Sequence, residues 1–370
     1  MHITKMKKSV AECLLVMTSF LLVAEPIMGT EQEFRTLKLI RTYRSEEELQ
    51  ATYPELFPQQ TIKETNDSII FYDPQTQKPT KQLEKVRSKI LREEKRGTDT
   101  IVFEEFHEYK TSTDASFVLY TEYERGYPKG NPHADIPELR IKPQMVALYN
   151  AKGEKITQLP TEVNVIKIAP DKQSFLAYGE GEEPSKYLYL YSMDGVLLKK
   201  EEMNGYLVAA YSQEGAFFPV FDAFGRKFSI FSKTGKKVYE NDYTTLIGDV
   251  QPILYGVFVS ENGTSFLLHT SGRLSLFTLD NQLLWDRSFP PGSAIYGCRF
   301  YSSNGVVIVI SRGEKSRIVE GIAKSFQKLQ IISLNSGQVV DEIEGITYTR
   351  LFKEAIIVQK EGIYYEYTVK

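Results

Sequence analysis

Residues 256–289, GVFVSENGTSFLLHTSGRLSLFTLDNQLLWDRSF, are the stretch of sequence that decides the fold. Four short runs rich in branched and aromatic residues are separated by ENG, SG and DN, which predicts four strands joined by three turns. Turns this short connect only antiparallel neighbours. In the third run Leu274 and Leu276 point one way while Phe277 and Leu279 point the other. We therefore expect a four-stranded sheet that is covered on both faces by neighbouring sheets.

Copies of this unit lie on both sides of it. Five third strands align, and each ends in a turn closed by Gly or Asn: MVALYNAKG (145–153), YLYLYSMDG (187–195), KFSIFSKTG (227–235), RLSLFTLDN (273–281) and KLQIISLNSG (328–337). Three positions after each closing residue comes an aliphatic side chain: Ile156, Leu198, Val238, Leu284 and Val340. Second strands align as well, and SFLAYGE begins at Ser174 and SFLLHTS at Ser265. The constant offset indicates a true internal repeat.

The repeat recurs about every 40 to 50 residues, the period of four-stranded propeller blades. The segments resemble WD-repeat-like and quinoprotein-like β-propeller repeats, in which a Ser-x-Asp-Gly turn precedes the second strand. SQEG, SENG and SSNG, which end at Gly215, Gly263 and Gly305, fit that turn loosely. The resemblance covers residues 98–370 and implies an all-β propeller. The Gly-His and Trp-Asp signature pair of true WD repeats is absent, since the only Trp-Asp, Trp285 and Asp286, falls on a fourth strand. Repeated Trp docking motifs and Asp boxes are absent as well, so the resemblance specifies architecture and not activity.

The last copy ends on a third strand, IYYEYTVK (363–370), so the final sheet lacks its outermost strand. Propellers usually close by borrowing a strand from the other end of the chain. RTLKLIRTY (35–43) or SIIFY (68–72) is the expected donor. We predict about six blades, five complete in sequence and one completed by the N-terminal region, with seven blades as the alternative. Pro219, inside a second strand, predicts a bulge or distortion in its sheet.

Residues 1–29 have the order of a secretory signal peptide: a basic start, an apolar run CLLVMTSFLLVA (13–24), and small residues at Ala24 and Gly29. The run is too short to span a bilayer comfortably, although an uncleaved anchor is the alternative. We therefore expect an exported protein, periplasmic or extracellular, with no transmembrane span in the mature chain. The mature part keeps only Cys298, so it can form no internal disulfide, and we interpret that thiol as buried and structural.

Residues 30–97 do not resemble the repeat, and we expect a separate segment with one or two strands and a helix. Ser45 before three glutamates predicts a helix N-cap. Residues 80–96 predict a helix that stops at Gly97 and is either solvated or partner-binding. Its apolar stripe consists of Leu83, Val86, Ile90 and Leu91.

Loops between second and third strands expand in three repeats, at 124–143, 179–186 and 312–327. In a four-stranded meander they project from one face of the ring, and binding commonly lies on variable loops held by a rigid scaffold. Harmless insertion is the alternative, since long loops cost little closure entropy. The 312–327 loop is net basic, which is compatible with an acidic partner and equally with an ordinary solvated surface. The candidate binding residues are Tyr127, His133, Asp135, Arg140, Arg312, Lys315 and Arg317.

Candidate catalytic residues are Glu104, Glu105 and His107, on a first strand that would line the central channel, and Asp135 in the first long loop. Glycoside chemistry needs two carboxyls at a defined separation, and no motif here fixes such a pair. The spacing of His and carboxylates matches no metal-ligand set, so we expect no metal and no cofactor. His269, inside a second strand, is expected to be a core histidine.

Two classes of function follow. The first is an exported non-catalytic propeller, a binding or assembly scaffold that presents its loop-rich face to a protein, peptide or glycan. The alternative is an exported propeller hydrolase or lyase that acts on carbohydrate with carboxylates at the channel mouth. The formal net charge of -3 gives no indication of a nucleic-acid partner. Because no carboxylate pair is fixed, the sequence favours the scaffold.

Overall fold

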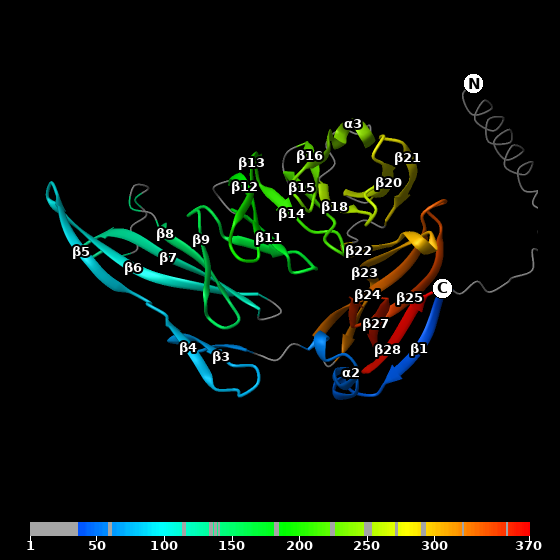
Figure 1. The fold of residues 1–370 in the computed structure, drawn as a ribbon, viewed down its shortest axis with the longest axis horizontal. Coiled ribbons are helices and arrows are strands. Elements are labelled where there is room, and N and C mark those ends of the chain that lie inside the picture. Colours follow the sequence, from blue (N-terminus) through cyan, green and yellow to red (C-terminus); the bar gives the residue numbers. More distant parts are fainter. Residues whose placement is uncertain are drawn as a thin grey trace, which may run out of the picture. The chain divides into compact units, whose positions relative to one another are not determined.

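The structure is a computed structural model, which describes residues 36–57, 61–112, 116–132, 136, 139, 141–180, 185–222, 226–247, 254–270, 273–289, 294–319, 322–352 and 354–370. These residues form antiparallel sheets with a few short helices, which confirms the all-β class (Figure 1). The expected signal peptide lies outside them, so export stays a prediction. No helix in the described ranges is long and apolar enough to cross a bilayer.

Four consecutive sheets repeat the predicted unit of four antiparallel strands in sequence order. Their strands are β10 (Val165–Ile168), β11 (Ser174–Tyr178), β12 (Ser185–Ser192) and β13 (Leu197–Gly205); β14 (Leu207–Ala209), β15 (Phe217–Asp222), β16 (Lys227–Ser232) and β17 (Lys237–Asp242); β18 (Leu254–Val259), β19 (Ser265–Thr270), β20 (Arg273–Thr278) and β21 (Leu283–Ser288); and β22 (Ile295–Tyr301), β23 (Val306–Val319), β24 (Ile322–Ser333) and β25 (Val339–Ile346). Two short helical turns, α3 (Tyr243–Ile247) and η3 (Ser302–Asn304), follow β17 and β22. The internal repeat is therefore confirmed.

Both faces of the β18–β21 sheet are covered, as its third strand predicts. On one face Leu274 and Leu276 are buried in a cluster with Val307 of the β22–β25 sheet. On the other face Phe277 is buried with Phe228 of the β14–β17 sheet. Equivalent clusters join the other sheets to their neighbours in chain order. The apolar residues on both sides of each strand thus supply two interfaces instead of one.

The turn between third and fourth strands packs on the preceding sheet. Gly337, with φ 68°, lies over the ring of Trp285 on β21, where an added Cβ would come within 2.8 Å of the ring. The Trp285 Nε1 donates a 2.9 Å hydrogen bond to the Leu334 carbonyl. The closing glycine of the repeat is therefore required both for its left-handed conformation and for the space above its neighbour.

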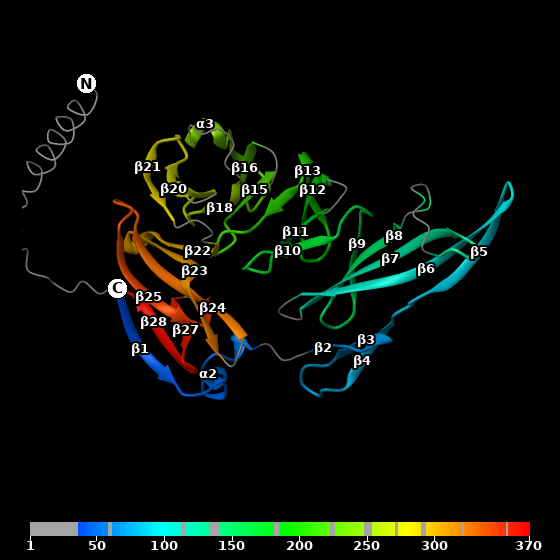
Figure 2. The same ribbon diagram turned by 180° about the vertical axis from the view of Figure 1, so that it is seen from behind.

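The last sheet takes its outermost strand from the N-terminal segment. β26 (Tyr348–Phe352), β27 (Ala355–Lys360) and β28 (Ile363–Val369) form a meander, and β1 (Leu37–Tyr43) pairs antiparallel with β28. Figures 1 and 2 both show β1 in blue beside β28 in red. The donor is RTLKLIRTY and not SIIFY, which lies in another sheet. The number of blades and the closure of the ring remain predictions.

The rest of the N-terminal segment contains the helix predicted at Ser45. The helix α2 (Glu46–Thr52) begins at Ser45, whose Oγ accepts a 3.4 Å hydrogen bond from the Glu48 amide. The single turn η1 (Pro54–Leu56) follows. A three-stranded sheet consists of β2 (Ile62–Glu64), β3 (Ser68–Tyr72) and β4 (Pro79–Glu84).

The helix predicted over residues 80–96 is wrong, because these residues form β4 and β5 (Lys89–Arg96). Leu83 packs in the cluster that contains Phe71, whereas Ile90 is 61% exposed, so the apolar stripe does not share one face. Gly97, with φ 64°, lies in the tight turn to the next strand and not at a helix end. Cross-strand pairing has overridden the local periodicity.

β5 joins the first repeat in a five-stranded sheet with β6 (Asp99–Thr111), β7 (Phe117–Pro128), β8 (Lys142–Asn150) and β9 (Lys155–Leu159). β8 is the predicted third strand of this repeat. β6 has 13 residues and β7 has 12, whereas β19 and β20 have 6 each. The first repeat therefore extends well beyond the length of a plain sheet.

Pro219 does not produce the expected bulge. β15 and β16 keep an unbroken register through Pro219, which lies opposite Ile230. The pairing of β14 with β15 instead ends at Ala209 and Val220, beside the proline. The missing N–H of the proline therefore falls where the regular ladder stops. Beyond it the chain keeps two backbone hydrogen bonds to β15, from the Ala210 amide to the Pro219 carbonyl at 3.4 Å and from the Ser212 amide to the Phe217 carbonyl at 2.8 Å.

Candidate functional site

The two ends of each sheet carry different features. We call the end where the first strand meets the second the turn end, and the end where the second meets the third the hairpin end. Turns at the turn end are short, and the hydroxyl of Ser260 stabilises one of them by accepting from the Ser265 amide at 3.1 Å. Long extensions occur at the hairpin end.

Two of the predicted long loops at the hairpin end are partly β-strand. β7 continues to Pro128, and residues 124–128 pair with β6. β23 reaches Val319, where Arg317 lies opposite Lys324 of β24. The loop predictions are wrong in these parts, because backbone pairing continues past the packed portion of the sheet. Residues 181–184 of the remaining loop lie outside the described residues.

Glu104 lies in an extension that we call the arm, which consists of β5 with residues 99–105 of β6 and 123–128 of β7. The side chain is buried, and its carboxylate accepts from Ser88 Oγ at 2.7 Å, Arg125 Nε at 2.6 Å and Tyr127 OH at 3.3 Å. Burial acts to raise the pKa of Glu104, but the Ser88 and Arg125 contacts outweigh it and hold the pKa below its usual range. Glu104 thus ties the strands of the arm together, and the hydroxyl of Tyr127 takes part in the same network.

Glu105 and His107 are brought together on the opposite face of β6. His107 Nε2 lies 3.0 Å from a Glu105 carboxylate oxygen, and its ring makes an edge contact with Tyr120 at 5.1 Å. Successive residues of a strand point to opposite faces, so Glu104 and Glu105 do not face one substrate as a pair. Among the described residues, no group of three or more His, Cys, Asp or Glu is arranged to hold a metal ion.

The other predicted site residues are placed only in part. His133, Asp135 and Arg140 lie outside the described residues. Arg312 is exposed on β23, and Lys315 and Arg317 lie on the hairpin extension of the same strand, without described side chains. Their binding roles stay predictions.

Exposed apolar residues lie at the hairpin end. The sequence pattern predicted Ile90 and Leu91 on a helix that is solvated or partner-binding, and Tyr255 and Tyr296 were missed. Ile90 and Leu91 on β5 are 61% and 40% exposed, and Tyr255 and Tyr296 are each 55% exposed. The two tyrosines occupy equivalent positions on β18 and β22, where a register shift precedes a glycine in both strands. A bulge at this point re-aims the side chain out of the sheet. The shared Tyr-Gly at the start of both strands was the signal in the sequence.

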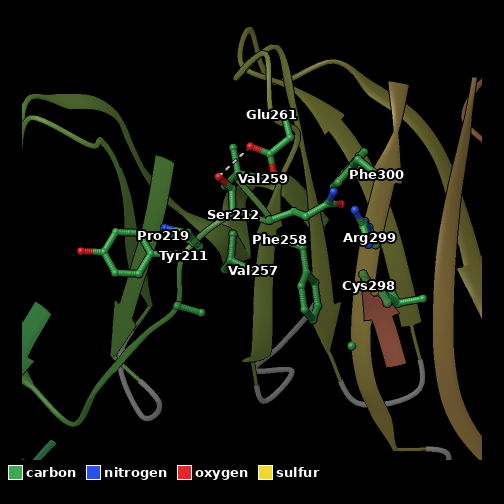
Figure 3. Close-up of a pocket in the computed structure, with 14 residues that line it drawn as sticks. Tyr211, Ser212, Pro219, Val257, Phe258, Val259, Glu261, Cys298, Arg299 and Phe300 are labelled. Carbon is green, nitrogen blue, oxygen red and sulfur yellow. Dashed lines mark hydrogen bonds between the residues drawn. The ribbon is translucent and has the colours of Figure 1, made fainter. Parts of the chain in front are cut away.

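Residues of four neighbouring sheets line a pocket of about 340 Å³ at the turn end (Figure 3). Its walls come from the chain that follows β14, from the first strands β18 and β22, and from single residues of β15 and β26. The lining residues are 210–213, 257–259 and 297–300, with Pro219, Glu261 and Leu351. None of the site residues predicted from the sequence lies in this pocket.

Two charged side chains line the pocket, one from a strand and one from the turn between β18 and β19 (Figure 3). Arg299 on β22 is 5% exposed, its guanidinium lies 5.1 Å from the Tyr301 ring, and burial lowers its pKa. Glu261 accepts hydrogen bonds from Ser212 Oγ at 3.1 Å and from the Glu214 amide at 2.9 Å. Burial raises the pKa of Glu261, and the negative charge of Glu214 adds to the shift. The signal in the sequence was an arginine within the apolar run IYGCRFY.

Burial shifts the pKa values of two further residues, Cys298 and His269. Cys298, on the pocket wall, has a thiol whose pKa is raised by burial, which suppresses the nucleophilic thiolate. His269 is buried on β19, where burial lowers its pKa to about 4, so it is neutral at physiological pH. The prediction of a core histidine is confirmed.

No family model and no curated protein matches the chain. Solved structures match the chain. The β-propeller domain of Myceliophteria thermophila Cps50 (Swd1) is 11% identical with a TM-score of 0.37, over 76% of this chain and 100% of that one. A eukaryotic initiation factor is 12% identical with a TM-score of 0.41, over 76% and 62%. Kluyveromyces lactis Hsv2p is 11% identical with a TM-score of 0.36, over 74% and 94%. The assignment of the fold therefore rests on the repeated four-stranded sheets of this chain.

Proposed function

We propose that this protein is an exported, non-catalytic β-propeller that acts as a binding scaffold and engages a protein partner at the hairpin end of its sheets. The observation that carries the proposal is the arm, which combines an internally braced framework with exposed apolar side chains. A surface with both properties is preorganised for binding a partner.

The arm is braced by contacts that cross its three strands. The Arg92 guanidinium of β5 donates to both carboxylate oxygens of Glu124 on β7, at 2.8 and 3.0 Å, and lies 4.0 Å from the Phe103 ring of β6. Lys129 donates to Glu93 at 2.9 Å. A forked arginine contact fixes geometry as well as charge. Side chains held in this way lose little conformational entropy on binding.

The chemistry of the exposed residues favours a protein partner. Ile90 and Leu91 lie on an edge strand, between Lys89 and Arg92. Apolar side chains surrounded by charges resemble the core and rim of a protein interface. The flanking charges also protect the edge strand from unspecific pairing. Tyr255 and Tyr296, at the hairpin end of two other sheets, add the aromatic type that is enriched at energetically important interface positions.

Replacement of both arm residues tests the proposal. The variant carries Ile90→Asp and Leu91→Asp, and Leu198→Asp is the matched control because Leu198 is 51% exposed on the outer strand β13. Proteins cross-linked to the tagged full chain in its native host are compared between the variants. We expect a partner that is captured by the wild type and the control and at least ~10-fold less by the arm variant. Equal capture by all three proteins contradicts the proposal.

Export is tested separately. The basic start and the apolar run of residues 13–24 support a cleaved signal peptide. N-terminal sequencing of the protein from the compartment where it accumulates is expected to give a mature chain that begins near residue 30. An intact Met1 in that fraction contradicts cleavage.

A further inference from the structure

The sheet of β2, β3 and β4 ends one strand earlier than the other sheets. In each of the six other sheets of the described chain a further strand lies beside the third strand of the meander, as β21 lies beside β20 and β1 beside β28. No strand in the described ranges pairs with the outer edge of β4. The main chain of β4 is therefore open on the side where its counterparts are covered.

The register of this sheet is that of the repeat. Ser68, the first residue of β3, lies opposite Glu84 of β4, and the Lys85 amide donates to the Asp67 carbonyl at 2.8 Å. The strands β19 and β20 have the same pairing and the same bond from the residue that follows the third strand. β4 is thus the equivalent of the third strand β20.

The sheet also packs on its neighbour as a member of the repeat. An added Cβ on Gly153 would come within 2.9 Å of the Phe71 ring, as one on Gly337 would come within 2.8 Å of Trp285. Phe71 is buried in a cluster with Val118 of β7. The sheet is therefore built like the others up to the strand that it lacks.

The strand that is missing at this edge is the one that builds the arm. Four residues, 85–88, separate β4 from β5, and four residues, 279–282, separate β20 from its outer strand β21. β5 pairs with β6 instead of β4. The link stays close to β6, because the Val86 carbonyl accepts from the His107 amide at 2.7 Å. The arm and the open edge are thus consecutive parts of one surface.

The open edge offers main-chain hydrogen-bonding groups. Because the Lys85 amide bonds to the β3 side, the alternation of an antiparallel ladder directs the N–H and C=O of Gln82 away from β3. At the end of β4 the Tyr109 hydroxyl donates to the Glu84 carbonyl at 2.5 Å. The open part of the edge therefore runs over residues 80–83.

Two side chains on one face of this edge have a defined chemistry. The Lys81 Nζ donates to the Gly153 carbonyl at 2.6 Å and lies 5.1 Å from the Tyr149 ring, so these contacts leave its positive charge without an anion. Leu83, two residues further on the same face, is half-buried in the cluster of Phe71. A strand laid along β4 is thus matched by an acidic residue opposite Lys81 and an apolar residue opposite Leu83.

We propose that the protein partner of the arm adds an extended segment to β4, as the fourth and antiparallel strand of this sheet. The inference rests on the proposed scaffold function and states how the partner is held. The N–H and C=O of Gln82 pair with the main chain of the segment. Main-chain hydrogen bonds supply affinity in this mode of recognition, and alternate side chains supply specificity.

Selection of peptides on the full chain tests strand addition before the partner is known. The probe is a displayed library of random peptides long enough to cover β4. Gln82→Pro removes the outward N–H, and Gln82→Ala is the matched control because it changes the same side chain and keeps that N–H. We expect peptides that bind the wild type and Gln82→Ala at least ~10-fold more tightly than Gln82→Pro. If no such peptide is found, Pro79 and Lys81 only protect the edge, and the proposal is overturned.

Two further measurements complete the test. If Gln82→Pro does not fold, hydrogen exchange decides: a selected peptide must slow exchange in residues 80–83 of the wild type, and unchanged exchange there overturns the proposal. Capture of the partner separates this inference from the scaffold function. A partner that is lost from the Ile90→Asp, Leu91→Asp variant but bound equally by Gln82→Pro overturns strand addition alone, whereas equal capture by the arm variant contradicts the scaffold function.

Discussion

Glu104 in the arm and Glu261 in the pocket are two carboxyls withdrawn from water whose pKa values move in opposite directions. Burial acts to raise both. Glu104 is paired with Arg125 and accepts from Ser88, so its pKa falls. Glu261 receives hydroxyl and amide donors but lies near Glu214, so its pKa rises. The comparison shows that a buried carboxyl paired with an arginine braces the strands of the arm, whereas a carboxyl that lies near a second carboxylate is held in a form that disfavours its charge.

The largest expected effect concerns the packing of the turn end. An added Cβ on Gly263, with φ 66°, would lie 2.3 Å from the Phe217 ring, whereas one on Gly130, in the turn that follows β7, with φ 91°, meets nothing within 4 Å. Gly263→Ala is expected to lower the free energy of unfolding by about 3 kcal/mol through strain and overlap, and Gly130→Ala by about 1 kcal/mol through strain alone. Urea denaturation measures both. Equal losses contradict the tight packing of the turn end.

Acid is expected to weaken the β18–β21 sheet before it weakens the arm. The folded-state pKa of His269 is lowered to about 4 from 6.5, so the folded protein resists protonation. The contribution of neutral His269 to the free energy of unfolding is fully present above pH 6.5 and is lost as the pH falls toward 4. The total loss is about 3 kcal/mol. Denaturation from pH 7 to pH 4 measures the loss, and His269→Gln should flatten the profile. An unchanged profile in that variant contradicts the assignment.

Loss of the Glu104 charge is expected to loosen the arm alone. Glu104→Gln keeps an acceptor for Ser88 but breaks the ion pair with Arg125, which is partly exposed, so the cost is about 1–2 kcal/mol. Because its folded-state pKa is lowered, Glu104 stabilises above pH 4.5, and this contribution disappears as the pH falls through the folded-state pKa. Hydrogen exchange should quicken in residues 89–105 and 123–128 at pH 7. Faster exchange in β18 and β22 as well would contradict the conclusion that Glu104 stabilises only the arm.

The smallest expected effect has the opposite sign. The raised pKa of Glu261 means that its ionised form is disfavoured in the folded state, a cost that is present at neutral pH and relieved as the pH falls through the raised pKa. Glu261→Gln removes the charge and keeps an acceptor, so the free energy of unfolding at pH 7 should stay equal or rise by less than about 1 kcal/mol. Urea denaturation measures it, and a clear loss of stability contradicts the comparison with Glu104.

The sequence predicted the features that local patterns encode. The repeat of strands, the donor strand of the last sheet and the cap at Ser45 all follow from residue spacing, and all are confirmed. The helix expected over residues 80–96 failed because β5 is fixed by pairing with β6, which the periodicity of one segment does not report. The pocket was not predicted because Gln213, Glu261 and Arg299 come from three sheets that meet only in the folded chain.

Hydrogen exchange of the wild-type protein, with and without its cross-linked protein partner, most directly tests whether the arm is the binding surface. We predict slower exchange in residues 89–105 and 123–128, with no change in residues 210–214. Unchanged exchange in the arm with the partner bound would contradict the account.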